Sequence, residues 1–77
     1  MKQTLEYLLQ NIVSHPEDVV VQDIQDGESR TTLEIHTHPD DIARVIGRNG
    51  RIIKAVRDLI KIIAIQKNAF VDISIAE

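Results

Sequence analysis

The feature that most constrains this chain is a pair of glycines, Gly47 and Gly50, separated by two polar residues and flanked by apolar-periodic segments. This pattern predicts a short helix, a tight turn and a longer helix. A glycine just past a helix can take the left-handed conformation that closes it. A glycine at the start of the next helix leaves no Cβ in the path of a ligand. Because the positive end of that helix's dipole faces the turn, we expect an anion site there.

Basic side chains gather around this turn, although the chain as a whole carries a net charge of −3. Positions 44–57 hold five basic residues and no acidic one: Arg44, Arg48, Arg51, Lys54 and Arg57. Positions 1–41, by contrast, hold two basic and nine acidic side chains. The basic stretch predicts a phosphate backbone as the ligand. The acidic half is most simply a solvated surface, or else it meets a basic partner.

The length of 77 residues allows a single domain, positions 1–77, with a small core and no buried active-site pocket. Without cysteine, neither a disulfide framework nor a thiolate metal site can hold the fold. No apolar run approaches the roughly 20 residues that span a bilayer, and the N-terminal segment is amphipathic rather than a signal peptide. These features favour a soluble, cytoplasmic protein.

The first half of the chain predicts a helix and a hairpin. Apolar residues at helical spacing indicate a helix over positions 2–13, and the sequence Ser14-His15-Pro16 ends it. Positions 17–25 and 30–38 are predicted strands, and Gly27 supplies the turn between them. Alternation in the second strand places Leu33 and Ile35 toward the core.

In the second half, Pro39-Asp40-Asp41 predicts a helix start, because proline and carboxylates both suit a first turn. Helices are expected over positions 40–46 and 51–66, and a last strand over 70–75. In the longer helix, the residues expected to face the sheet are Ile52, Val56, Ile60 and Ile63, and those expected on the opposite face are Lys54, Arg57 and Lys61. In the last strand, the inward residues are Val71, Ile73 and Ile75.

The resulting order is α–β–β–α–α–β. A hairpin makes its two strands antiparallel, whereas a strand that returns after a helical crossover usually runs parallel to its neighbour. We therefore predict an α+β fold, with a three-stranded mixed sheet and helices packed on one face.

The residues around the turn resemble those of a known family. The run Val45-Ile46-Gly47-Arg48-Asn49-Gly50-Arg51-Ile52-Ile53 is similar to the Val-Ile-Gly-x-x-Gly-x-x-Ile signature of KH domains. The element order, with an extra helix and strand ahead of the core, resembles the bacterial type II KH fold. The resemblance covers essentially the whole chain, which has the size of a stand-alone single-KH bacterial protein.

The resemblance implies a clamp for the backbone of about four single-stranded nucleotides. Carried over by position, the clamp is Gly47, Arg48, Asn49 and Gly50. Arg51 and Lys54 would neutralise nearby phosphates, and Ile46 and Ile53 would form an apolar groove floor, closed by Ile35 or its neighbours. With no aromatic residue near the loop, base stacking is not expected. The implied function is that of a non-catalytic RNA chaperone or post-transcriptional regulator without a cofactor. The implied partners are single-stranded RNA and a second KH-containing protein.

Other interpretations of these residues are simpler or weaker. The glycine pair could form an ordinary helix–helix turn, but it is not a Walker loop, because Gly50 is followed by Arg-Ile. His36 and His38 share a strand face with Glu34, and exposed polar residues explain them better than a metal site does. Asp40 and Asp41 could be imagined as a catalytic pair, but helix-start electrostatics accounts for them. No catalytic residue and no metal site is predicted.

An uncharged stripe on the long helix predicts self-association. Its members lie at i, i+4, i+7 and i+11: Ala55, Leu59, Ile62 and Gln66. Either the first helix covers this stripe, or two copies pair through it about a two-fold axis, or a related KH protein does so. The alternative function is therefore a KH-fold interaction or dimerisation module with negligible RNA affinity.

Overall fold

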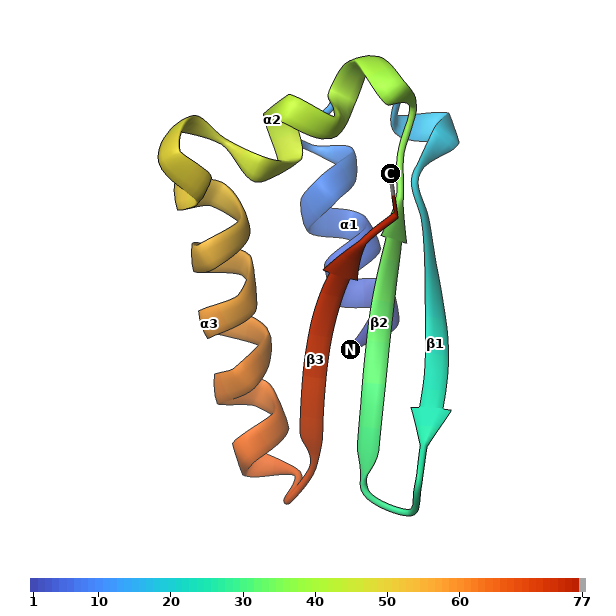
Figure 1. Ribbon diagram of the computed structural model, residues 1–77, viewed down its shortest axis with the longest axis vertical. Helices are drawn as coiled ribbons and strands as arrows, with labels where there is room; N and C mark the ends of the chain where they lie inside the picture. Colours follow the sequence, from blue (N-terminus) through green and yellow to red (C-terminus); the bar gives the residue numbers. More distant parts are fainter. Residues whose placement is uncertain (77) are drawn as a thin grey trace.

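The computed structural model describes residues 1–76 and has three α-helices and one three-stranded sheet (Figure 1). Along the chain the elements are α1 (Lys2–Gln10), β1 (Val20–Asp26), β2 (Arg30–His36), α2 (Ile42–Ile46), α3 (Arg51–Gln66) and β3 (Phe70–Ile75). The 3₁₀ turns η1 (Pro16–Asp18), η2 (Pro39–Asp41) and η3 (Arg48–Gly50) join them. The predicted order of elements is confirmed. None of the helices within residues 1–76 is long and apolar enough to cross a membrane.

The sheet is mixed, as predicted, with the order β1-β2-β3. β1 pairs antiparallel with β2, from Val20 opposite His36 to Asp26 opposite Arg30. β3 pairs parallel with β2, starting with Phe70 opposite Arg30. The parallel pairing arises because α2 and α3 carry the chain back along the sheet between these two strands. β3 is therefore an edge strand, and α3 runs beside it (Figure 1).

Four predicted boundaries extended too far, and one of them is the start of the helix expected over 40–46, because Pro39–Asp41 form η2 and α2 begins at Ile42. α1 ends at Gln10 instead of position 13, and the Asn11 side chain closes it by donating a hydrogen bond to the carbonyl oxygen of Tyr7 at 2.7 Å. β1 begins at Val20 instead of position 17, because Pro16 opens the turn η1 and the fixed φ of proline suits a helical first turn. β2 ends at His36 instead of position 38.

The core lies between one face of the sheet and the helices. Leu33 and Ile35 are 1% and 0% exposed, so their predicted inward orientation is confirmed, as it is for Val71 and Ile73. Ile75 is only half-buried. The full set of buried apolar residues is Leu5, Leu9, Val19, Val21, Leu33, Ile35, Val45, Ile53, Val56, Ile60, Ala64, Val71 and Ile73. All of this core is aliphatic.

The face of α3 that packs on the core differs from the predicted face. The buried residues of α3 are Ile53, Val56, Ile60 and Ala64. Ile52 and Ile63, which were expected to face the sheet, are half-buried at its flank. Ile52 packs under the turn instead, since a Cβ added to Gly47 would lie 2.6 Å from Ile52 Cγ1.

The basic side of α3 was also misplaced by the sequence argument. Lys54 does point into solvent, but Arg57 and Lys61 lie beside β3 and not on the opposite face. Arg57 Nη2 donates a hydrogen bond to the carbonyl oxygen of Ile73 at 3.4 Å. The long arginine side chain reaches one of the backbone carbonyl groups at the edge of β3. Helical periodicity does not predict this orientation, because it takes no account of neighbouring strands.

Candidate nucleic-acid interface

The turn between α2 and α3 has a backbone that requires glycine at one position and favours it at another. Gly47 has φ 78° and ψ 171°, and Gly50 has the left-handed values φ 72° and ψ 17°. Asn49 between them is also left-handed, at φ 57° and ψ 27°, which asparagine tolerates better than most residues. The Gly50 N–H donates to the Gly47 carbonyl oxygen at 3.1 Å and closes the turn.

The two glycines serve different purposes. At Gly47 a Cβ would approach the Ile52 backbone nitrogen to 2.9 Å and the Ile52 side chain more closely still. Gly47 is therefore needed for packing inside the protein. At Gly50 the nearest neighbour of an added Cβ is Ile53 Cγ2 at 4.0 Å, so the space above this residue is open. Gly50 thus leaves room for a ligand, as the sequence predicted.

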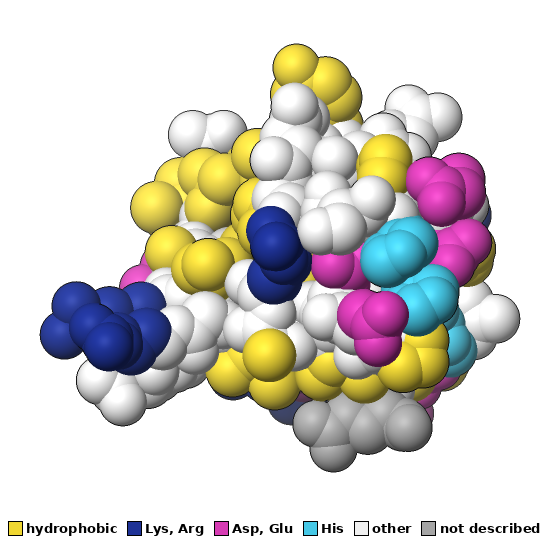
Figure 2. Space-filling view, turned by 90° about the horizontal axis from the view of Figure 1, so that it is seen from above, with side chains coloured by type: hydrophobic (Ala, Val, Ile, Leu, Met, Phe, Trp, Pro, Cys, Tyr) yellow, Lys and Arg dark blue, Asp and Glu magenta, His cyan; other side chains and the backbone are white. Residues whose placement is uncertain are grey.

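Exposed cations surround the turn. The cations Arg48 and Arg51 are exposed, and so is the uncharged Asn49 between them. In the described chain no side chain caps the N-terminus of α3. Figure 2 looks onto this end of the molecule and shows Lys and Arg side chains projecting on one side, with the histidines and acidic side chains gathered on the other. The positive end of the α3 dipole and these guanidinium groups favour an anion at the same place.

Lys54 is less free than the sequence suggested. Its Nζ lies 2.8 Å from Asp58 Oδ2, one turn further along α3. The hydrogen bond with Asp58 raises the pKa of Lys54, and the same bond lowers the pKa of Asp58. Both side chains are more than half exposed, so the pair contributes little to stability. Its consequence is that part of the Lys54 charge is already neutralised.

The predicted apolar floor of the groove is only partly accessible. Ile46 is half-buried, whereas Ile53 is 7% exposed and belongs to the core. Ile35 or its neighbours on that strand were expected to close the groove. Ile35 itself cannot, because it is fully buried, and β3 lies between β2 and α3 (Figure 1). Of the residues expected to form or close this groove by name, Ile46 is the one that keeps a partly accessible side chain.

Open hollows of the surface lie between α3 and β3. Two adjoining hollows of about 320 and 340 Å³ share Lys61, Val71 and Asp72. Arg57 and Ile73 complete the second, and Arg30, Ala64, Ile65, Ala69 and Phe70 complete the first. These residues were not predicted to form a site. The alternation of the last strand could have revealed part of it, because turning Val71 and Ile73 inward turns Phe70 and Asp72 outward.

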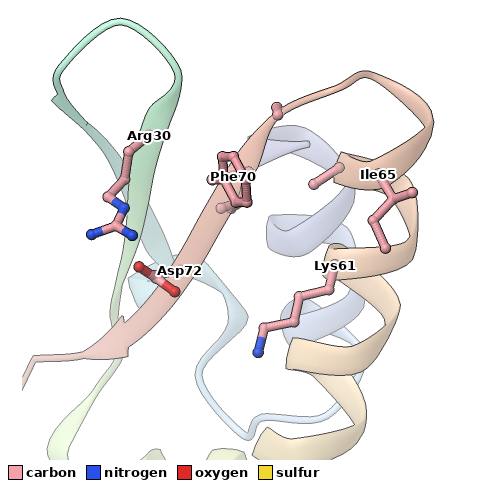
Figure 3. Close-up of a pocket in the computed structure, with 8 residues that line it drawn as sticks. Arg30, Lys61, Ile65, Phe70 and Asp72 are labelled. Carbon is pink, nitrogen blue, oxygen red and sulfur yellow. The ribbon is translucent and has the colours of Figure 1, made fainter.

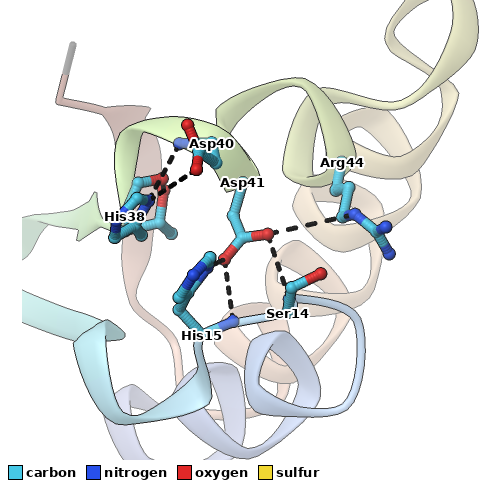
Figure 4. A network of polar contacts seen from close by, with 7 residues as sticks. Ser14, His15, His38, Asp40, Asp41 and Arg44 are labelled. Carbon is cyan, nitrogen blue, oxygen red and sulfur yellow. Dashed lines mark hydrogen bonds and ion pairs between the residues drawn. The ribbon is translucent and has the colours of Figure 1, made fainter.

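Asp41 is a structural anchor that the sequence analysis underrated. The carboxylate is 1% exposed and accepts hydrogen bonds from the backbone N–H groups of Ser14 and His15, at 3.0 and 2.9 Å (Figure 4). His15 Nδ1 lies 3.0 Å from the same side chain, and Arg44 Nε lies 3.9 Å away. Asp41 thereby ties the segment after α1 to the start of α2. Helix-start electrostatics alone does not account for it.

This contact perturbs the ionisation of both partners. The hydrogen bond to Asp41 raises the pKa of His15 above its ordinary value of 6.5, against a smaller opposing effect of burial. Burial tends to raise the pKa of Asp41, but the hydrogen bonds from Ser14 and His15 together outweigh burial and hold that pKa below 3.8. The folded state therefore favours an imidazolium beside a carboxylate.

The histidines are arranged differently from the sequence prediction. His36 Nε2 lies 2.7 Å from Glu34 Oε1, while His38 turns away and stacks on His15 with ring centroids 3.9 Å apart. His15, His38 and Asp40 bring their potential ligand atoms within 4.8 Å of one another. However, the two rings are nearly parallel, and the Nδ1 atom of His38 accepts a hydrogen bond from the Asp40 N–H. The nitrogen lone pairs of stacked rings do not converge on one point, as a metal ion requires.

The predicted association stripe is exposed on the surface of α3. Ala55, Leu59, Ile62 and Gln66 are all exposed, with Leu59 at 42% and Ile62 at 56%. The possibility that α1 covers this stripe is therefore wrong, because α1 packs against β1 instead. The apolar flank is available to a partner.

An α–β–β–α–α–β fold with a glycine-bracketed turn between its last two helices has the architecture of a type II KH domain. Comparison with known proteins agrees. A family model described as "KhpA/KhpB, KH domain" matches residues 2–75. The chain belongs to this KhpA/KhpB family of KH domains.

Several curated relatives are named RNA-binding protein KhpA. The protein of Clostridium perfringens is 40% identical over 75 residues, which cover 97% of this chain and 99% of the relative. That of Chlamydia pneumoniae is 36% identical over 77 residues, covering 100% and 97% of the two chains. That of Mycobacterium bovis is 46% identical over 56 residues, covering 73% and 69%. No solved structure gives a significant match.

Proposed function

We propose that this protein is a single-stranded RNA-binding module that acts as one KH domain. The observation that carries the proposal is the turn, where an open space above Gly50 meets the uncapped end of α3 and the exposed Arg48 and Arg51. Relatives that match nearly the whole chain are named RNA-binding proteins, which supports the same function.

In this proposal the RNA backbone crosses the segment Gly47-Arg48-Asn49-Gly50, and its phosphates approach the N-terminal end of α3. Arg51 and Lys54 neutralise further phosphates along the helix. Ile46 contacts the nearest sugar or base, and Ile53 supports it from the core. The bases then turn toward the hollows between α3 and β3, because these are the open concave surfaces next to the basic helix.

The protein is proposed to act without catalysis and without a cofactor, in the bacterial cytoplasm, as an RNA chaperone or post-transcriptional regulator. A reaction would need a nucleophile beside a base, or converging metal ligands. Within residues 1–76 a histidine lies beside a carboxylate in three pairs: His36 with Glu34, His15 with Asp41 and His38 with Asp40. In the last two pairs, Asp41 and His38 already accept hydrogen bonds from backbone N–H groups.

The test replaces Arg48 and Asn49 together by Asp and measures binding of fluorescein-labelled octanucleotides by fluorescence anisotropy. Both side chains are exposed, and aspartate tolerates the left-handed backbone at position 49, so the fold should persist. We expect binding to fall by at least tenfold, because two carboxylates would face phosphate.

A control with the same change in charge separates a local effect from a global one. Lys2→Asp with Gln3→Asp also lowers the net charge by three, at exposed positions in the first turn of α1, where aspartate suits the helix dipole. This variant should bind RNA with nearly the affinity of the unmodified protein. Equal loss in both variants, or no loss in either, would contradict the clamp assignment.

The second candidate function, self-association, rests on the exposed stripe of α3. We infer that two copies, or one copy and a KhpB-like KH protein, pair through Ala55, Leu59, Ile62 and Gln66. A symmetric pair would place two glycine turns on one particle and raise the avidity for RNA without a new contact.

Sedimentation at tens of micromolar tests this inference. Ile62→Glu should give a folded monomer, whereas Ile24→Glu, the same change at an exposed residue of β1, should leave the dimer intact. Sedimentation of the unmodified protein as a monomer would exclude the homodimer. Binding of RNA with negligible affinity, together with a stable dimer, would favour the interaction module over the RNA-binding module.

A further inference from the structure

The far end of the hollow between α3 and β3 exposes an aromatic ring. Phe70, the first residue of β3, is 68% exposed, and Ile65 on α3 beside it is 72% exposed (Figure 3). The Phe70 N–H donates to the carbonyl oxygen of Ser29 at 3.0 Å, so the ring extends from a fixed backbone. Neither the core nor the glycine turn uses this ring. An exposed aromatic residue in a concave site is a candidate for ligand contact.

Charged side chains line the same hollow as the ring. Arg30 lies opposite Phe70 in the register of β2 and β3, and Lys61 projects from α3 on the other side (Figure 3). Within residues 1–76, neither cation takes part in an ion pair. Asp72, two residues along β3, lines the hollow between them. The rims can therefore hold phosphate, while the carboxylate repels phosphate from the interior.

This end of the hollow is connected to the glycine turn by the same helix. α3 has 16 residues, which corresponds to a length of about 24 Å. Arg57 and Lys61 lie between its two ends on the β3 side, and the two hollows share Lys61 and Asp72. A strand clamped at Gly50 and running along α3 would therefore reach Phe70 after several nucleotides.

We propose that Phe70 is a stacking platform for a nucleobase of the bound RNA, beyond the nucleotides held at the turn. Arg30 and Lys61 hold the adjoining phosphates. The Asp72 carboxylate accepts a hydrogen bond from an exocyclic amino group of the base. A carboxylate can only accept, so cytosine, with its N4 amino group, is favoured over uracil, whose O4 is an acceptor. This inference rests on the proposed RNA-binding function and adds a site and a base preference to it.

A nucleic acid fits these observations better than a second protein surface does. The hollow that contains the ring also contains Arg30 and Lys61, which form no ion pair in the described chain, and a phosphate backbone supplies matching charge at regular spacing. Stacking on an aromatic ring is also available to every base, so the platform needs no special sequence.

The test compares Phe70→Ala and Phe70→Tyr for binding to the octanucleotides rC8 and rU8 at one fixed salt concentration. Loss of the ring should weaken binding of both by about fivefold or more, the lower part of the range for base–aromatic stacking. Phe70→Tyr keeps the ring and should restore the affinity. Ile24→Ala, which shortens an exposed apolar side chain on β1, is the matched control and should have no effect.

Asp72→Asn tests the base preference, because an amide can both donate and accept. The ratio of rC8 to rU8 affinity should exceed one in the unmodified protein and should fall toward one in this variant. In a direct test, the ring protons of Phe70 should shift upfield in the NMR spectrum when rC8 is added.

The outcomes separate this inference from the proposed function. If the unmodified protein binds neither octanucleotide, the proposed RNA-binding function is wrong. If it binds them and Phe70→Ala binds equally well, the stacking site is wrong and the function stands. If Phe70→Ala changes sedimentation but not RNA affinity, the surface is a contact between proteins and the stacking site is again wrong. An unchanged ratio in Asp72→Asn overturns the base preference.

Discussion

Replacing Gly47 by alanine should destabilise the protein far more than the same change at Gly50, although both glycines have positive φ and belong to the same turn. Gly47 combines φ 78° with ψ 171°, a region that essentially only glycine occupies. Its added Cβ would also lie 2.6 Å from Ile52 Cγ1 and 2.9 Å from the Ile52 nitrogen, so both a side chain and backbone would have to move.

These two effects set the magnitude. Backbone strain of this kind costs about 1–3 kcal/mol, and forcing an extra methyl group into packed surroundings costs about 1–3 kcal/mol more. Gly47→Ala should therefore reduce the free energy of unfolding by about 2–6 kcal/mol. At Gly50 the backbone is left-handed and the space is open, so the cost is about 1–2 kcal/mol. Reduced freedom of the unfolded chain offsets part of that cost.

Urea unfolding followed by circular dichroism would measure the difference, since the chain has no tryptophan and its single tyrosine is exposed. The centres of the two ranges differ by about 2.5 kcal/mol, so we expect a gap of about that size between the two variants, or a midpoint difference of roughly 1 M or more. RNA binding should show the reverse sensitivity, because a bulkier residue at Gly50, such as leucine, would block the backbone of the ligand while most of the fold remains. Stabilities of the two alanine variants within about 0.5 kcal/mol of each other would refute the distinction drawn between the glycines.

Three further results are expected. In a melting experiment, Asp41→Asn should lower the thermal midpoint clearly more than Asp40→Asn. The reason is that Asp41 is 1% exposed and accepts hydrogen bonds from two backbone N–H groups, whereas the Asp40 side chain is 77% exposed. Equal midpoints would contradict the role of Asp41 as a structural anchor. The His15–Asp41 contact should stabilise the fold most between about pH 4 and 6.5. Because the pKa of Asp41 is lowered, its contribution is present above pH 3.8 and is lost as the pH falls through the folded-state pKa. Because the pKa of His15 is raised, its contribution is full below pH 6.5 and is lost as the pH rises through the folded-state pKa. His15→Gln should therefore flatten the alkaline side of a stability profile, and an unchanged profile would count against the pair. Arg51→Ala should reduce the slope of log affinity against log salt by about one, and Lys54→Ala by less, because Lys54 is already paired with Asp58; equal slopes would show that this pair does not matter.

The order of elements was accessible from the sequence because every long element has a clear period. The strand face of Leu33 and Ile35 and the extent of α3 followed from alternation and helical spacing alone. The rotation of α3 about its own axis, which decides the residues that face the sheet, could not be predicted in this way. Ile52 and Ile53 are adjacent and equally apolar, so periodicity cannot decide which one packs on the sheet and which one fills the space under Gly47.

The parts of the candidate site that depend on local backbone conformation could be predicted, because that conformation requires particular residues. The parts that depend on contacts between distant segments could not. Two glycines at a fixed spacing reveal the turn. The hydrogen bonds from Ser14 and His15 to Asp41 join positions that are 27 and 26 residues apart, and no local sequence pattern predicts such a contact. The groove likewise depends on which strand lies next to α3. Ile35 or its neighbours on β2 were expected there, but β3 occupies that place.

These corrections change how the protein would hold RNA. If the groove had been floored by Ile46, Ile53 and Ile35, the ligand would meet an apolar surface without charge or aromatic rings, and contacts at the turn alone would set its affinity. The groove between α3 and β3 instead places Arg57 and Lys61 along the path and Phe70 at its far end. Affinity should then increase with the length of the RNA until the strand spans α3. A tetranucleotide that fills only the turn should bind Phe70→Ala and the unmodified protein equally, whereas an octanucleotide should distinguish them, because only the longer strand can reach the ring.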